Sequence, residues 1–183
     1  MGSASPVVPE PVVADDKDWT WVLQRPCPEC GFDVSSVARE DVGDIVRANA
    51  LAWRRVLEEP GATERVVAER WSTLEYACHV RDVFRLFDER LALMQAEDDP
   101  LFDNWDQDST AITDRYDEQL PSAVSDELAS AGATIADSFE RVHDDQWART
   151  GRRSDGASFT VESFARYFVH DPIHHLYDVE RGA

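Results

Sequence analysis

Three of the five histidines lie close together near the carboxyl end of the chain, at His170, His174 and His175. With Asp171 they form two pairs of potential metal ligands spaced four residues apart, His170/His174 and Asp171/His175. Side chains four residues apart share one face of a helix, so either pair could bind a single metal ion. The segment therefore predicts a divalent metal site on a carboxy-terminal helix.

The apolar period of this segment favours the Asp171/His175 pair. With a turn of about 100° per residue and Phe168 at the centre of the apolar face, His175 lies about 20° and Asp171 about 60° from that centre. By the same measure His170 lies about 160° and His174 about 120° away, on the outer face. A proline inside the segment could kink the helix, so His170/His174 stays open as the alternative pair.

A third ligand is expected from another helix, and His79 is the candidate. It shares a side of its segment with four apolar or aromatic residues (Tyr76, Val83, Leu86 and Phe87). Three nitrogen and oxygen ligands with room for water are typical of an open catalytic site for zinc or another transition metal. Asp82 and Asp178, each three residues after a candidate histidine, are placed to accept hydrogen bonds from these ligands.

Four segments with helical periodicity must position these residues, at 40–59, 69–96, 121–142 and 160–180. Ser72 and Glu75 predict a capping box at the start of the second helix. The fold class predicted is all-α, an antiparallel four-helix bundle with an irregular N-terminal arm.

The segments between these helices complete the predicted organisation. Residues 101–120 form a long connection with a short helix, which permits an order other than simple up-down. Residues 151–158 are predicted as a loop, and nowhere does the sequence alternate as a strand would. Residues 1–18 are predicted to be a flexible tail and residues 19–183 a single domain.

Two cysteines lie in the arm, residues 19–37, within the sequence Cys27-Pro-Glu-Cys30-Gly-Phe. They resemble half of a zinc knuckle, and a single CxxC motif lacks two of the four ligands of a structural zinc site. Cys78 with either of the outward histidines, His170 or His174, could complete it. The favoured interpretation is a tight turn with two reduced thiols.

Charge and cysteine content exclude several classes of function. The net charge of −19 would repel nucleic acid and anionic membrane surfaces. There is no apolar run of about eighteen residues, no secretory signal, and an odd number of cysteines, so we expect a cytoplasmic protein. The expected partners are small molecules and a second copy of the chain in a homodimer.

Two motifs together resemble the DinB-like superfamily, which includes mycothiol-dependent maleylpyruvate isomerases and bacillithiol S-transferases. They are Trp71-Ser72-x-x-Glu75-x-x-x-His79-Val80-x-Asp82 and the closing His-Asp-x-x-His-His-x-x-Asp-Val of residues 170–179. The resemblance covers residues 40–180 and implies a four-helix bundle with one zinc or nickel ion, held by His79, Asp171 and His175. The family commonly has histidine or glutamate where this chain has Asp171, so that ligand is a departure.

The resemblance also implies a function, a metal-dependent S-transferase or isomerase that uses a low-molecular-weight thiol. The arginine-rich composition indicates a GC-rich, actinobacterial genome and hence mycothiol as the thiol. Arg152 and Arg153 could pair with a carboxylate of substrate or thiol, and Asn49 is a candidate site-facing residue in an apolar stripe. The alternative is a non-catalytic metal- or small-molecule-binding stress-response protein, which an occluded four-coordinate site would favour.

Overall fold

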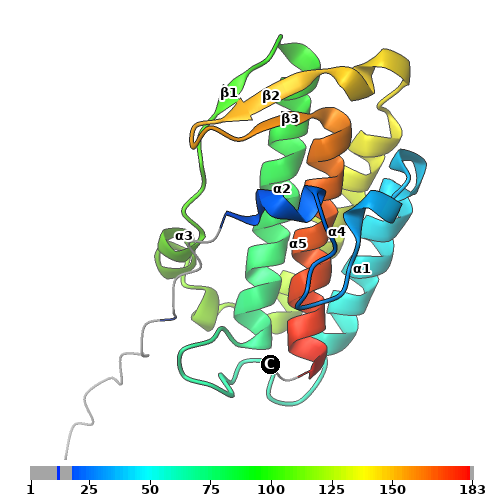
Figure 1. Cartoon of the computed structure of the whole chain (residues 1–183). Helices are drawn as coiled ribbons and strands as arrows, with labels where there is room; N and C mark the ends of the chain where they lie inside the picture. The colour runs from blue at the N-terminus through cyan, green and yellow to red at the C-terminus, as the bar shows by residue number, and fades with distance from the viewer. Residues whose placement is uncertain (1–11, 13–17, 182–183) are drawn as a thin grey trace, which may run out of the picture.

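Four long helices form the body of the protein in the computed structural model, which describes residue 12 and residues 18–181 (Figure 1). They are α1 (Val42–Leu57), α2 (Thr73–Ala96), α4 (Pro121–Glu140) and α5 (Val161–Arg181). Each lies within or almost within a segment predicted from helical periodicity, and the predicted all-α four-helix bundle is confirmed. The predicted tail, residues 1–18, lies outside the described residues except at positions 12 and 18.

The helices are not arranged in chain order. Helices α1 and α2 each pack mainly against α4 and α5 and make few contacts with each other. Around the bundle, α1 and α2 are therefore diagonal to each other, and α4 and α5 lie between them. Figure 1 shows α2 and α4 both running toward the small sheet, whereas α1 and α5 run away from it. Each of α1 and α2 therefore has one antiparallel and one parallel neighbour, an order that the long connection between α2 and α4 permits.

A three-stranded sheet lies at the end of the bundle where α2 and α4 end (Figure 1). Its strands are β1 (Leu101–Phe102), β2 (Thr150–Arg153) and β3 (Ser158–Thr160), with β1 parallel to β2 and β2 antiparallel to β3. The prediction of a loop at 151–158 without strands is wrong, because these residues form the β2–β3 hairpin. Strands of two to four residues are too short to show an alternating pattern.

Short elements occupy the remaining connections. Helix α3 (Gln107–Thr113) is the short helix predicted between α2 and α4, and a 3-10 helix, η4 (Tyr116–Glu118), follows it. The N-terminal arm contains η1 (Trp19–Leu23) and η2 (Val34–Ser36), both of which contact α5. Two further 3-10 turns, η3 (Arg39–Asp41) and η5 (Asp144–Ala148), precede α1 and follow α4.

The core is aromatic and closely packed where α4 meets its two neighbours. Trp53, Phe84, Phe139 and Phe168, one from each long helix, are at most 2% exposed. A Cβ atom at Gly132 of α4 would lie 3.0 Å from the Ala50 side chain and 3.1 Å from that of Phe84. Glycine here thus allows α4 to approach α1 and α2 together. No described helix is both long and apolar enough to cross a membrane.

The amino terminus of α2, one turn and a half before His79, is held by the predicted capping box. Ser72 Oγ accepts the Glu75 backbone N–H at 3.2 Å, and the Glu75 carboxylate accepts the Ser72 N–H at 2.8 Å. Arg65 also donates to both oxygens of Glu75, with its Nε at 2.9 Å. Burial raises the pKa of Glu75, but these hydrogen bonds lower it by a larger amount, so the carboxylate stays ionised.

We expect Ser72→Ala to lower the free energy of unfolding by about 1 kcal/mol, because the first turn of α2 loses its cap. The measurement is urea denaturation followed by circular dichroism. Ser122→Ala is the matched control, since Ser122 is exposed in the first turn of α4 and its side chain has no hydrogen bond among the described residues. A Ser72→Ala protein as stable as this control would show that the box contributes nothing.

Candidate metal centre and substrate cavity

The structure brings His79 of α2 together with Asp171 and His175 of α5. His79 Nε2 lies 3.4 Å from one oxygen of Asp171, and His175 Nε2 lies 3.8 Å from the other. The two imidazole rings are 4.8 Å apart and nearly perpendicular. One potential ligand atom from each residue lies within 4.8 Å of the others. This spacing suits three ligands around one cation.

The hydrogen bonding of these residues also fits a cation. His79 is fully buried, and neither of its ring nitrogens has a hydrogen-bond partner among the described residues. The Asp171 oxygen that faces it is likewise buried without a hydrogen bond. Unpaired buried polar atoms are costly, and a divalent ion would satisfy both. Burial raises the pKa of Asp171, but the nearby His79 and His175 lower it by a larger amount, so this side chain is a carboxylate.

One side of this group opens onto a cavity of about 750 Å³. All three residues line it, and the side chains of Asp171 and His175 remain 33% and 16% exposed. The ring of Trp105, from the connection after β1, stacks on His79 at 5.3 Å and an angle of 11°. The arrangement is that of three protein ligands with accessible space beside them, which is typical of catalytic metal sites.

Arg90 lines the same cavity and was missed in the sequence. It is 6% exposed, donates to the Asp103 carbonyl at 2.6 Å, and forms no ion pair with a carboxylate in the described part of the chain. Burial lowers its pKa to about 10, which leaves it a cation at neutral pH. The sequence did contain evidence for this position. Arg90 follows His79 by eleven residues, about three helical turns, so both residues lie on the same face of α2.

The two arginines predicted to meet substrate have different positions. Arg153 lines the cavity, where it pairs with Asp155 at 2.8 Å and donates to the Tyr167 hydroxyl at 3.0 Å. Arg152 is not part of the lining; its half-exposed side chain pairs with Asp99 at 2.8 Å. The prediction for Arg152 is wrong because alternate residues of strand β2 point to opposite faces.

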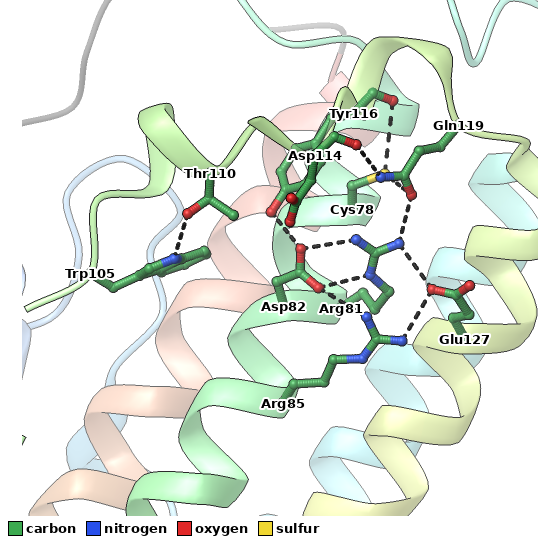
Figure 2. Close-up of polar contacts among 10 residues, drawn as sticks. All are labelled: Cys78, Arg81, Asp82, Arg85, Trp105, Thr110, Asp114, Tyr116, Gln119 and Glu127. Carbon is green, nitrogen blue, oxygen red and sulfur yellow. Dashed lines mark hydrogen bonds and ion pairs between the residues drawn. The ribbon is translucent and has the colours of Figure 1, made fainter. Parts of the chain in front are cut away.

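Asp82 lies one turn after His79 but is bound elsewhere, as Figure 2 shows. Its carboxylate accepts hydrogen bonds from Arg81 at 2.8 and 2.9 Å, from Arg85 at 3.2 Å and from the Tyr116 hydroxyl at 2.5 Å. The prediction that Asp82 accepts from His79 is therefore wrong. The network instead joins α2 to η4, and through Glu127 to α4.

Asn49 and Asp178 complete the predicted set. Asn49 is buried but lies outside the cavity lining, and its amide donates to the Pro172 carbonyl at 2.9 Å. It thus joins α1 to α5 rather than facing substrate, and that prediction is wrong. The Asp178 carboxylate lies 3.8 Å from His175 Nδ1 and 3.4 Å from His174 Nε2.

His170 and His174 do not face solvent, contrary to the prediction. They are 3% and 5% exposed, because the N-terminal arm covers that side of α5. They form a separate group with Cys27 and Cys30 and do not converge on His79. Cys78 takes no part in it, because its thiol points to the Tyr116 carbonyl and the Gln119 side chain.

Comparison with known proteins supports the family suggested by the motifs. A family model described as the DinB superfamily matches residues 16–179. YfiT from Bacillus subtilis, described as a probable metal-dependent hydrolase with an unusual four-helix bundle topology, has a similar fold. The TM-score is 0.69 at 15% identity, over 80% of this chain and 90% of that one. Curated protein sequences give no match.

Replacing His79, Asp171 or His175 by alanine is expected to lower the bound metal by about one equivalent per chain, because two ligands hold a divalent ion far more weakly than three. Elemental analysis of the purified variants measures this. His143→Ala, which removes the exposed histidine that caps the start of η5, is the control and should keep the wild-type content. A wild-type metal content in His79→Ala would rule out the site.

Proposed function

Because the chain belongs to the DinB superfamily, we propose that it is a metal-dependent enzyme that joins a low-molecular-weight thiol to an electrophilic substrate. The metal, zinc or nickel, would be held by His79, Asp171 and His175. The thiol would be mycothiol or a similar compound, and the reaction S-transfer or isomerisation. The observation that carries this proposal is the three-residue site beside a large cavity that also contains the buried Arg90, which pairs with no carboxylate among the described residues.

When bound, a divalent ion acts as a Lewis acid and lowers the pKa of a thiol or water that it coordinates. The protein's own part is to hold the ligands and to limit water. Trp105 stacks on His79 and fixes the plane of its ring, and Trp71 packs against the same ring at a centroid distance of 5.3 Å. Asp178 lies near His175 Nδ1, where its carboxylate favours the ring orientation that leaves Nε2 toward the site.

The length of the cavity supports two reactants rather than water and one small substrate. His79 and Arg90 are eleven residues apart on one helix, so their backbones lie about 16 Å apart along its axis. The cavity volume of about 750 Å³ is within the range of sites for drug-sized ligands. A nucleophile at the metal and an anionic group at Arg90 would therefore occupy opposite ends of one site.

The lining also suits a sugar-containing thiol. Asp18 and Asp106 belong to the cavity wall, and each uses one carboxylate oxygen to cap a short helix. A carboxylate accepts up to about four hydrogen bonds, so both retain capacity for the hydroxyl groups of a ligand. Arg90, and Arg153 beside it, would bind a carboxylate of the electrophilic substrate.

Two other functions remain as candidates and are tested by the same assay. The description of YfiT suggests a hydrolase, in which metal-bound water replaces the thiol. A non-catalytic metal- or small-molecule-binding protein is the second, and the open side of the three-residue site argues against it.

We expect metal-loaded protein to consume an electrophilic substrate only when thiol is present, and His79→Ala to abolish this. Thiol-independent ester hydrolysis would indicate the hydrolase, and no turnover with any thiol would indicate the binding protein.

Arg90→Gln is expected to raise KM for a carboxylate-bearing substrate about 10- to 100-fold, since one charge-assisted contact contributes about 1.5–3 kcal/mol. Arg90→Lys should show a smaller increase, because it keeps the charge. Steady-state kinetics with a charged and an uncharged electrophile give the comparison. Arg152→Gln is the matched control, and an effect as large as that of Arg90→Gln would contradict the assignment.

A further inference from the structure

A second group of potential metal ligands lies where the N-terminal arm meets α5, and two of its members, His170 and His174, also line the edge of the cavity. Cys27 Sγ is 3.7 Å from His174 Nδ1, and Cys30 Sγ is 3.7 Å from His170 Nε2. The four ligand atoms all lie within 4.8 Å of one another. We propose that these residues form a closed structural zinc site that fastens the arm to α5. This goes beyond the proposed catalytic function and does not depend on it.

The backbone of the arm brings the two sulfur atoms together. The Gly31 N–H donates to the Cys27 carbonyl at 2.8 Å, and the Cys27 N–H donates to the Phe32 carbonyl at 2.9 Å. Gly31 has a φ of +75°, a conformation that glycine adopts without strain. The tight turn places both cysteine side chains on the side that faces α5.

The identity, number and spacing of the ligands match structural zinc. Tetrahedral zinc with bonds of about 2.3 Å to sulfur and about 2.0 Å to nitrogen separates a sulfur from a nitrogen by about 3.5 Å. The two observed sulfur–nitrogen distances of 3.7 Å are close to this value. The sequence order is C-x2-C followed by H-x3-H, the spacing common in Cys2His2 sites. Two thiolates and two imidazoles also favour zinc over magnesium or calcium.

The surroundings of the histidines orient them for this role. The Nε2 atom of His174 lies 3.4 Å from the Asp178 carboxylate and 3.5 Å from that of Glu29, which leaves Nδ1 toward Cys27. Carboxylates commonly accept from the second ring nitrogen of a zinc-bound histidine. Trp19 packs against both histidines, with ring centroids 5.5 and 5.0 Å away, and limits access of water.

The site would also shape the active-site cavity. Asp18 and Trp19 belong to the cavity wall, and the cysteine turn begins eight residues after Trp19. Zinc binding would replace the two thiol protons, which pass to solvent, and give a neutral site of two thiolates and two imidazoles. The bonds would hold the arm in place on α5 and so keep this part of the wall closed.

Cobalt is the probe that distinguishes this site from the catalytic one. Only this site has cysteine ligands, so only cobalt bound here gives thiolate-to-cobalt charge-transfer absorption. Full-length reduced wild-type protein loaded with Co²⁺ should show this absorption, and so should His79→Ala. The double variant Cys27→Ser/Cys30→Ser should lose it and lose about one equivalent of zinc. Cys78→Ser is the matched control for a buried thiol and should behave like wild type.

Absence of the absorption from wild-type protein would overturn the proposal, and this result does not depend on whether any variant folds. Retention of full zinc content by the double variant would overturn it as well. A second measurement concerns the arm itself: chelation of zinc should expose residues 19–37 to protease, at a rate at least about tenfold higher. An unchanged rate after complete zinc removal would contradict the fastening role. None of these readouts requires catalytic activity.

Discussion

Helix α5 carries two pairs of potential metal ligands that are offset by one residue, and this offset governs the surrounding structure. A one-residue step turns a helix by about 100°, so His170/His174 and Asp171/His175 cannot face the same neighbour. The first pair faces the N-terminal arm and the second faces α2. Each pair therefore has different partners, cysteines from the arm in one case and His79 in the other. Helix α5 lies between these two segments and contacts both.

The helix order places the second pair at one end of a long cavity. Because α2 and α5 are antiparallel neighbours, moving from His79 toward Arg90 along α2 corresponds to moving from Asp171 back toward Tyr167 along α5. The small sheet closes that end, and strand β2 supplies Arg153 there. The connection between α2 and α4 has a matching role, since its Trp105 stacks on His79. The cavity is thus lined partly by the helices and partly by connecting segments whose sequences have no apolar period.

The sequence predicted what local periodicity determines and failed where distant contacts decide. The four helices and the association of His79 with Asp171 and His175 follow from apolar spacing on each helix. The same reasoning placed His170 and His174 in solvent, because a helical wheel assumes that water lies opposite the core. The arm that covers them is 140 to 147 residues away in sequence and has no period of its own. Arg152 was misassigned for a similar reason, since strand β2 was too short to be recognised.

The chemistry of the two groups keeps them distinct although His174 and His175 are adjacent in sequence. Their rings are 5.7 Å apart and nearly perpendicular, so each directs its nitrogen atoms to a different side of α5. Thiolate and imidazole ligands in one group favour zinc, whereas two imidazoles and a carboxylate in the other suit zinc or nickel. Aspartate at position 171 has a shorter side chain than histidine or glutamate, so its carboxylate lies closer to the α5 backbone. A group of four ligands then leaves no position for substrate, whereas a group of three beside a cavity does. On this basis, structure and catalysis would be divided between two faces of one helix.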